Sequence, residues 1–213
     1  MIKVIIADDH AVVRTGLQLI FDTTADIAVV DEADRGNELL LKLKDNACDV
    51  VILDLSMPGR DGFDILKEIR KEYPDLPVII FSMKPDDSYA LRILRNGASA
   101  FINKEQPPEE LINAVRMIAR GEKYYTHRQA ESLLNYFQKE KQSCTLFPHE
   151  RLTDREFQIL CMLAYGRKKK EIAEKLFISV NTINNHRNNI LRKMELKGNS
   201  DLARYAVQHN LVE

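Results

Sequence analysis

The sequence has few cysteines and no long apolar run. Its three cysteines form no CxxC pair and are odd in number, which argues against a disulfide framework or a zinc site. The longest apolar run, around Val50–Leu53, is far shorter than the roughly 20 residues that span a bilayer. No basic segment followed by an apolar one opens the chain, as it would in a secretory signal. We therefore expect a cytoplasmic protein without membrane contact.

The charges are unevenly distributed, although the net charge is only −1. Met1–Tyr125 carries 16 basic against 22 acidic residues, whereas Thr126–Glu213 carries 15 against 10. A content of 45% hydrophobic and 30% charged residues is typical of a folded globular chain. The length of 213 residues is enough for two domains of about 100 residues each. The sequence thus predicts an acidic domain followed by a basic one that binds anions or nucleic acid.

The first half of the chain alternates short apolar runs with segments of helical spacing. Short runs rich in Val and Ile are typical of strands that are buried on both faces of a parallel sheet. Alternating strand and helix units predict an α/β fold, a doubly wound five-stranded parallel sheet covered by helices. The predicted strands are Ile2–Ala7, Ile27–Val30, Val50–Leu53, Val78–Phe81 and Ala100–Ile102.

The pattern changes after a fifth predicted helix at about Pro107–Arg120. Tyr124–Gln142 is polar overall but carries one apolar stripe with helical spacing, which could dock on a domain or on a second subunit. From Leu152 onward the spacing is helical throughout. We expect a first domain at residues 1–121, a helical linker at 122–148 and a smaller all-α domain at 149–213. The apolar stripe consists of Ala130, Leu133, Leu134 and Phe137.

Three carboxylates follow the first and third predicted strands. Asp8 and Asp9 come directly after Ile2–Ala7, and Asp54 comes directly after Val50–Leu53. In a doubly wound sheet these strands are neighbours, and their carboxyl ends flank the crevice where ligands bind. Converging carboxylates repel one another, so they need a cation, and oxygen ligands in a phosphate-handling site favour Mg²⁺.

Two further polar residues follow the other predicted strands. Ser82 follows the fourth strand and offers a hydroxyl, and Lys104 follows the fifth and offers a charge that can pair with a phosphoryl group. A carboxylate nucleophile, a divalent metal, a hydroxyl and a lysine are the groups needed to form an aspartyl-phosphate. Helix capping is the alternative for a single carboxylate, but it does not explain the whole set.

This pattern resembles the receiver domain of response regulators, which has a flavodoxin-like fold. The resemblance covers about Met1–Gly121 and rests on the segments IIADDH, VILDLSMPGRDG, IIFS and FINKE. It implies that Asp54 accepts a phosphoryl group from a sensor histidine kinase. It also implies that Asp9, Asp54 and the backbone carbonyl of Ser56 bind Mg²⁺, while Asp8 contributes through a water molecule.

The same resemblance implies a conformational switch between Ser82 and Phe101. In the family the hydroxyl moves to the phosphate and the aromatic ring turns into the space that it leaves. The sequence departs from the family at Glu105, where many receivers have a proline with a cis peptide bond after the lysine. A cis bond before a non-proline residue costs about 2.5–4 kcal/mol. The geometry of the peptide after Lys104 therefore stays open at this point.

The second half contains the pattern of a helix-turn-helix. Thr153 and Glu156 have the spacing of a capping box ahead of an apolar run, and Gly166 is suited to end that helix. A short helix at Lys169–Leu176 and a longer helix from about Val180 to Glu195 follow. In such motifs the last helix enters the major groove of DNA.

The longer predicted helix has two distinct faces. Ile183, Ile190 and Met194 are spaced to face the core, whereas a stripe rich in asparagine occupies the other side. Asparagine can bond bidentately to adenine, and lysines beside the helix can hold phosphates. The alternative is that this stripe is only a solvated polar surface. The residues that we expect to contact DNA are Lys169, Lys170, Asn181, Thr182, Asn184, Asn185, Arg187, Asn188 and Arg192.

The segment LTDREFQILCMLAYGRKKKEIAEKLFISVNTINNHRNNILRKM resembles the DNA-binding domain of the LuxR/NarL/FixJ class, over about Glu150–Glu213. Asn184 stands where the family often has lysine, which leaves the recognised base sequence open. The two resemblances together imply a two-component response regulator of the NarL/FixJ class that is not an enzyme. Its implied partners are a sensor histidine kinase, promoter DNA and a second copy of the chain when phosphorylated, with RNA polymerase as a further candidate.

Two other functions can be weighed against this interpretation. A Mg²⁺-dependent aspartyl-phosphate hydrolase would carry a DxDxT motif, which the sequence lacks, and a second general base beside Asp54. A signalling module that acts only through protein contacts would use the basic half as a protein-binding bundle. A salt-dependent DNA gel shift distinguishes this last function from ours.

Overall fold

The computed structural model describes residues 1–60, 62–83, 87–127, 129–131, 133–134, 147–209 and 211–212. The chain divides into two compact units, Met1–Pro85 with Ala90–Gln129, and Asp86–Tyr89 with Ala130–Glu213. The expected domain division after residue 121 stays a prediction. Residues 135–146 of the expected linker, including Phe137 of its apolar stripe, lie outside the described residues. None of the described helices is long and apolar enough to cross a bilayer.

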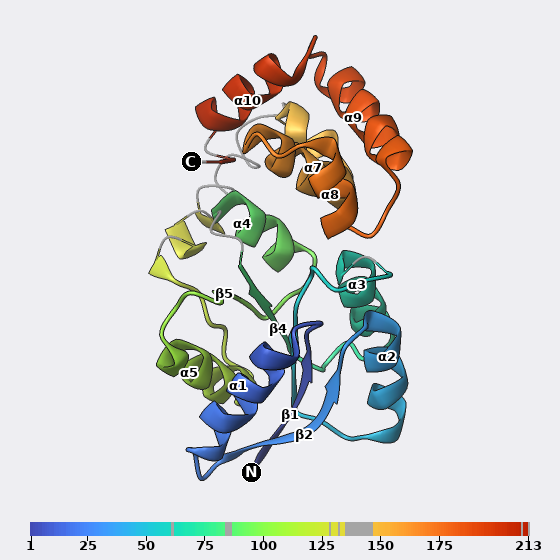
Figure 1. The fold of residues 1–213 in the computed structure, drawn as a ribbon. Helices are drawn as coiled ribbons and strands as arrows, with labels where there is room; N and C mark the ends of the chain where they lie inside the picture. The colour runs from blue at the N-terminus through green and yellow to red at the C-terminus, as the bar shows by residue number, and fades with distance from the viewer. Residues whose placement is uncertain are drawn as a thin grey trace. The chain divides into compact units, whose positions relative to one another are not determined.

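The first unit is built on a parallel sheet with the strand order β2-β1-β3-β4-β5 (Figure 1). The predicted five-stranded sheet is confirmed, although β2 continues to Ala33 rather than ending at Val30. Every residue of β3 and β4 is buried, as expected for Val- and Ile-rich strands that have helices on both faces. The strands are β1 (Ile2–Ala7), β2 (Ile27–Ala33), β3 (Val50–Leu53), β4 (Val78–Ser82) and β5 (Ala100–Asn103).

Helices follow the strands and cover the sheet. On one face α1 and α5 pack against the strands, and Leu17 and Phe21 of α1 join Leu111 and Val115 of α5 in the hydrophobic core. On the other face α2 and α3 lie side by side and contact each other (Figure 1). The helices between the strands and after β5 are α1 (Ala11–Asp22), α2 (Gly36–Asp45), α3 (Gly62–Glu72), α4 (Asp87–Arg95), of which Ala90–Arg95 belongs to this unit, and α5 (Pro108–Ala119).

The strand order places the ends of β1 and β3 next to each other. Ala7 pairs with Leu53 at the end of the ladder, and the backbone N–H of Asp54 donates to the carbonyl of Ala7 at 2.8 Å. The chain then turns so tightly that Gly62 lies against the backbone of Leu55. A Cβ at position 62 would be only 2.5 Å from the Cα of Leu55, so the turn requires glycine there. The residues that follow β1 and β3 therefore share one edge of the sheet.

The described residues of the second unit from 147 onward form helices and no strand, as the sequence predicted. Ile172, Ile183, Ile190 and Leu202 are fully buried and form part of its core. The elements are η1 (Pro148–Arg151), α7 (Asp154–Ala164), α8 (Lys169–Lys175), α9 (Val180–Met194) and α10 (Asn199–Gln208). Gly166 follows α7 with φ +74°, which confirms its predicted role at the end of that helix.

The predicted capping box at the start of α7 is confirmed and also ties α7 to α9. The backbone N–H of Thr153 donates to Glu156 at 2.8 Å, and the hydroxyl of Thr153 accepts from the N–H of Glu156. The ammonium of Lys193 on α9 donates to the same carboxylate at 2.6 Å. Burial would raise the pKa of Glu156, but the hydrogen bonds from Lys193 and Thr153 outweigh it and lower the pKa below its ordinary value.

Replacement of Glu156 by Gln should destabilise the second unit by about 2 kcal/mol at neutral pH, since it removes the buried carboxylate that pairs with the half-buried Lys193. A lowered pKa means that the carboxylate stabilises the fold above the pKa of the unfolded chain, near 4.5. This contribution disappears as the pH falls from there through the folded-state pKa. Hydrogen exchange of α7 and α9, measured from pH 7 down to pH 3, should show the loss in the wild type and a shallower dependence in the variant.

Glu174→Gln is the matched control, because Glu174 is an exposed carboxylate on α8. It should leave the protection of α7 and α9 unchanged at every pH. Equal protection of the wild type and Glu156→Gln would show that this carboxylate does not hold the two helices together.

Candidate functional site

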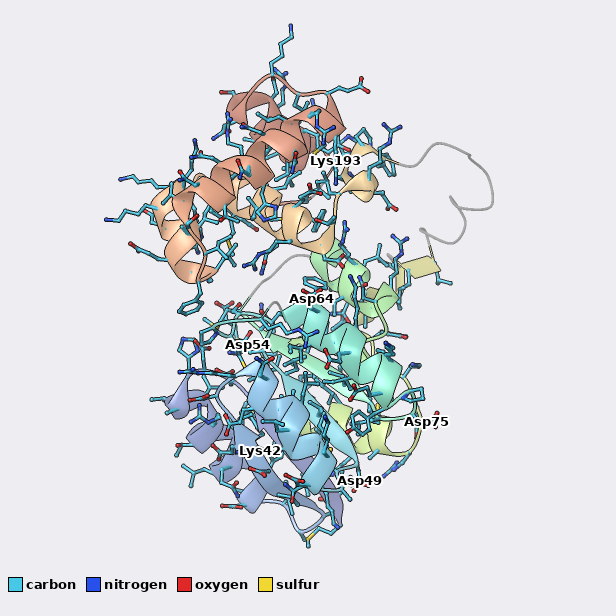
Figure 2. The ribbon with its side chains drawn as sticks, turned by 90° about the vertical axis from the view of Figure 1, so that its right-hand side faces the viewer. Lys42, Asp49, Asp54, Asp64, Asp75 and Lys193 are labelled. Carbon is cyan, nitrogen blue, oxygen red and sulfur yellow. The ribbon has the colours of Figure 1, made fainter. Side chains whose placement is uncertain are left out.

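A cluster of carboxylates lies where β1 and β3 end. Asp8 and Asp54 are almost completely buried, with exposed fractions of 1% and 3%. One oxygen of Asp54 accepts from the backbone N–H of Ser56 at 3.0 Å. Figure 2 shows Asp54 at this edge of the first unit, whereas Asp49, which precedes β3, lies at the opposite edge. The residues that the sequence placed around one crevice are thus brought together.

Lys104 reaches into the cluster from the end of β5. Its ammonium donates to Asp8 at 2.5 Å and to Asp54 at 2.8 Å, and only 7% of its side chain is exposed. Burial would lower the pKa of Lys104, but the charges and hydrogen bonds of Asp54 and Asp8 raise it above its ordinary value. A protonated lysine therefore stands against the oxygen of Asp54 that does not bind Ser56.

Among the described residues, two buried side-chain oxygens at the ends of β1 and β4 have no hydrogen-bond partner, Oδ1 of Asp9 and Oγ of Ser82. The Asp9 oxygen lies 3.0 Å from Nδ1 of His10, but not in hydrogen-bonding geometry. Burial raises the pKa of Asp9, and repulsion from Asp54 and Asp8 adds to this effect, while His10 opposes it. Unsatisfied buried acceptors beside other carboxylates are suited to a cation.

Ligand atoms from Asp8, Asp9, His10 and Asp54 all lie within 4.8 Å of one another, which is close enough for a single metal ion. The three carboxylates were predicted from the sequence, but His10 was not, although the run Asp8–Asp9–His10 places it beside them. The backbone N–H of His10 donates to Asp8 at 2.9 Å. The predicted contribution of the Ser56 carbonyl stays a prediction. The set of carboxylate oxygens suits a hard cation such as Mg²⁺.

The predicted switch pair, Ser82 and Phe101, lies on the adjacent strands β4 and β5. Ser82 ends β4 and is 1% exposed, and Phe101 on β5 is 4% exposed, so both side chains are buried. The backbone carbonyl of Phe101 accepts a hydrogen bond from the side chain of Gln129 at 3.1 Å. The peptide bond before Glu105 is trans, which answers the question that the sequence left open.

In the second unit, α9 has the two faces that the sequence predicted. Ile183, Ile190 and Met194 are buried in the core. Of the residues expected to contact DNA, Lys169, Thr182, Asn184 and Arg187 are half-buried. The exposed ones are Lys170, Asn181, Asn185, Asn188 and Arg192.

Some of the polar residues on α9 bond to one another or to neighbouring elements. The ammonium of Lys169 on α8 donates to Oδ1 of Asn184 at 2.7 Å. The guanidinium of Arg187 donates to Oδ1 of Asn199, the first residue of α10, at 2.6 Å. Sequence spacing along one helix did not predict these contacts, because each joins two separate helices. Lys169 and Asn184 are thus a hydrogen-bonded pair that links α8 to α9.

Both parts of the chain match models of known families. The model of the response regulator receiver domain matches residues 4–116. The model of bacterial regulatory proteins of the luxR family matches residues 150–206.

The chain is also similar to whole proteins. It is 41% identical to the oxygen regulatory protein NreC of Staphylococcus carnosus over 215 residues, which cover 99% of each chain. Among solved structures, it is similar to RcsB from Salmonella enterica serovar Typhimurium bound to promoter P1flhDC with the phosphomimetic BeF₃⁻. The identity is 27% and the TM-score 0.65, over 96% of this chain and 97% of that chain. Another structure of the Salmonella typhimurium RcsB response regulator gives 27% identity and a TM-score of 0.59, over 98% and 100% of the two chains.

Proposed function

We propose that this chain, which belongs to the response regulators with a LuxR-type DNA-binding domain, is switched by phosphorylation of Asp54. A sensor histidine kinase supplies the phosphoryl group, and binding of promoter DNA is the output. The observation that carries the proposal is the buried carboxylate of Asp54, held 2.8 Å from the ammonium of Lys104 and close to an oxygen of Asp9 that accepts no hydrogen bond from the described residues.

Four residues around Asp54 have separate roles in this proposal. Ser56 orients the carboxylate through its backbone N–H, which leaves the other oxygen facing Lys104. Once the phosphoryl group is on Asp54, the ammonium of Lys104 gives up a hydrogen bond to a carboxylate and donates to a phosphoryl oxygen instead. The hydroxyl of Ser82, which has no partner in the described residues, then donates to that group. Phe101 turns into the space that the hydroxyl leaves.

Mg²⁺ is the cofactor that we propose for this crevice. Asp9, Asp54 and the backbone carbonyl of Ser56 would hold it, with Asp8 contributing through water. When bound, the ion neutralises the carboxylates and the incoming phosphoryl oxygens. The Asp9 oxygen supports this assignment, because it is buried and accepts no hydrogen bond from the described residues.

We propose that α9 reads bases in the major groove and that α8 holds phosphates. Asn181, Asn185 and Asn188 are exposed along α9, and Lys170 is exposed on α8. Exposed amides on such a helix can read base edges, and lysines at its flank can fix the register on the backbone. Thr182, Asn184, Arg187, Arg192 and Lys169 complete the proposed contact surface.

The chain acts as a dimer when phosphorylated. Modules with one recognition helix commonly bind paired half-sites about one helical turn apart. One solved RcsB structure is described as two RcsB dimers bound to two parallel DNAs. Binding of promoter DNA places the protein in the cytoplasm with the chromosome, where RNA polymerase is a further proposed partner.

Phosphorylation should raise both the affinity for paired half-sites and the fraction of dimer, because it shifts the receiver between two states. Sedimentation and DNA gel shifts with and without BeF₃⁻ and Mg²⁺ measure both. If the mass and the DNA affinity stay identical at concentrations that bracket binding, phosphorylation does not control this output. If DNA binding shows no salt dependence at any concentration, the second unit is a protein-binding bundle instead.

A further inference from the structure

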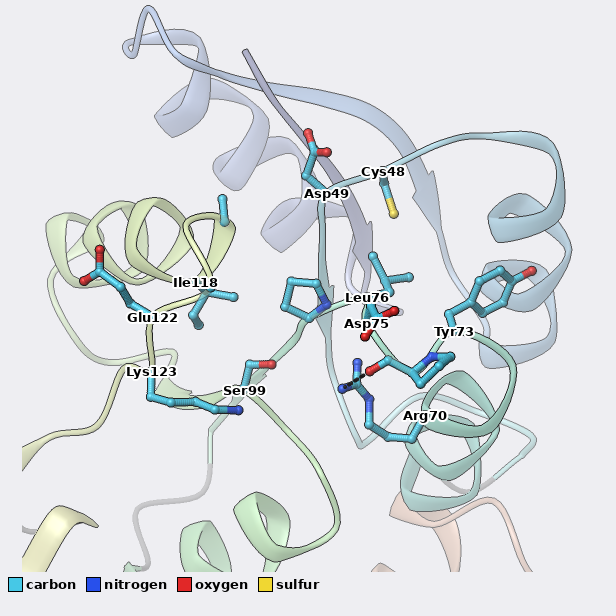
Figure 3. Close-up of a pocket in the computed structure, with 14 residues that line it drawn as sticks. Cys48, Asp49, Arg70, Tyr73, Asp75, Leu76, Ser99, Ile118, Glu122 and Lys123 are labelled. Atoms are coloured by element: carbon cyan, nitrogen blue, oxygen red, sulfur yellow. Dashed lines mark hydrogen bonds between the residues drawn. The ribbon is translucent and has the colours of Figure 1, made fainter.

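A polar cavity of about 750 Å³ lies at the edge of the first unit's sheet that is opposite to Asp54 (Figures 2 and 3). Its walls come from the segments that precede β3, β4 and β5 and from the ends of α3 and α5. This volume is in the range of sites that hold small molecules. None of its lining residues belongs to the carboxylate cluster, so a ligand here would be bound independently of phosphorylation chemistry.

Arg70, near the end of α3, is the charged group of this cavity whose hydrogen bonds are incomplete. Nη1 donates to the carbonyl of Pro74 at 3.0 Å, but Nε and Nη2 are buried and have no hydrogen-bond partner in the described part of the chain. The stem of Arg70 passes against Gly97, where a Cβ would lie 2.8 Å from Cδ. Gly97 also has φ +97°, a backbone conformation that favours glycine. Both the backbone conformation and the contact with Cδ therefore disfavour a side chain at position 97, which leaves the space that the Arg70 stem occupies. Two buried donors on a cation are costly to leave unpaired, and an anion would satisfy them once a rotation of the side chain brings them to the cavity surface.

Another arginine of this chain uses its Nε and Nη2 to bind a carboxylate. On α5, Nε and Nη2 of Arg116 each donate to one oxygen of Asp26, at 2.8 Å and 2.8 Å. This parallel pair of bonds is the bidentate geometry that arginine makes with carboxylate and phosphate. The corresponding pair of nitrogens on Arg70 has the same spacing and no acceptor among the described residues.

Other groups in the cavity favour a negative charge at the same place. In Figure 3 the side chains of Ser99 and Lys123 point into the cavity toward the guanidinium of Arg70. Ser99 is only 5% exposed. The carboxylates of Asp49 and Glu122 point away from it in the same view, and Asp49 already accepts from the backbone N–H of Lys3 at 2.8 Å.

Two remaining groups in the walls set the local charge. Burial raises the pKa of the Cys48 thiol to about 11, so it is neutral at physiological pH. Asp75 is the carboxylate that acts electrostatically on Arg70, without a hydrogen bond between them in the described residues. Asp75 is exposed, so it can turn outward when a ligand's oxygens take its place.

We propose that this cavity binds a small oxyanion, a carboxylate or a phosphate, through the Nε and Nη2 donors of Arg70 with help from Ser99 and Lys123. Asp75 competes with the ligand for the guanidinium. The site adds a second input to the chain, a dissolved metabolite that binds at the edge of the sheet away from Asp54.

The test is a titration of the full-length protein, labelled with ¹⁵N on arginine, with sodium succinate and with inorganic phosphate at constant ionic strength. The Nε–H resonance of Arg70 is assigned by its loss in Arg70→Gln. It should shift with a saturable dependence on at least one of the two anions, and the anion with the lower Kd identifies the ligand class. No saturable shift with either one overturns the proposal.

Three variants sharpen the result by isothermal titration calorimetry. Arg70→Gln should weaken binding roughly tenfold or more, because it removes a charge-assisted bidentate contact. Asp75→Asn, at an exposed position that should not affect folding, should tighten binding by about threefold, because it removes the competing charge. Lys71→Gln removes an exposed charge from the next position of α3 and should leave the Kd unchanged. Equal affinities of wild type and Asp75→Asn, or equal losses in Arg70→Gln and Lys71→Gln, would show non-specific attraction.

Discussion

Asp54→Asn abolishes labelling when the protein is incubated with Mg²⁺ and a ³²P-labelled small phosphodonor; this is the expected result. The amide keeps the shape of the side chain and can still accept from Ser56, but it is not a nucleophile toward phosphorus. Asp9→Ala should also remove labelling, because it deletes a carboxylate that we assign to the metal. Lys104→Ala should weaken the DNA response more than the labelling itself.

The control for this experiment is Asp64→Asn, which changes an exposed carboxylate on α3. It should be labelled at the wild-type rate. Peptide mapping of the labelled wild type should place the phosphoryl group on Asp54 alone. If Asp54→Asn accepts label as fast as the wild type, another residue is the phosphoacceptor and our assignment is wrong.

Substitutions on α8 and α9 should separate recognition of bases from binding of phosphates. Asn185 and Lys170 are both exposed and have no side-chain partner within the described residues, so each can be replaced without breaking an internal bond. Asn185→Ala should cost about 1–3 kcal/mol on the preferred site and scarcely change binding to random DNA. Lys170→Ala should weaken binding to both and reduce the salt slope by about one unit. Fluorescence anisotropy at several salt concentrations measures both effects.

Asn184 should behave differently from Asn185. Because Lys169 donates to its side chain, Asn184→Ala frees a lysine as well as removing an amide. We expect its effect on the preferred site and on the salt slope to be non-additive with that of Lys169→Ala. Lys44→Ala, which removes an exposed charge from α2, serves as the control and should change neither quantity. If Asn185→Ala weakens specific and random binding equally, α9 does not read bases.

The parts of this fold that could be predicted from the sequence are those that depend on local spacing. The buried strands were recognised because runs of Val and Ile fit a sheet covered on both faces. The capping box at Thr153 and Glu156 was recognised because its two hydrogen bonds lie within four residues. The carboxylates of Asp8, Asp9 and Asp54 could be placed together because parallel strands end at a common edge.

The features that the sequence did not reveal depend on contacts between distant segments. Lys193 and Glu156 are 37 positions apart in the sequence and lie on different helices, and no periodicity indicates the bond between them. The contact between Lys169 and Asn184 joins α8 to α9 in the same way. The cavity around Arg70 is assembled from several separate segments, and its incomplete hydrogen bonds exist only in the folded chain.

The contact between Gln129 and Phe101 determines where an isolated receiver fragment should end. Gln129 is 6% exposed, accepts from the backbone N–H of Thr126 at 3.1 Å and donates to the backbone carbonyl of Phe101 at 3.1 Å. A receiver fragment that stops at Gly121 loses this anchor and removes the side-chain donor from the carbonyl of Phe101. A fragment prepared for phosphorylation or crystallisation should therefore extend past Gln129, to about residue 131.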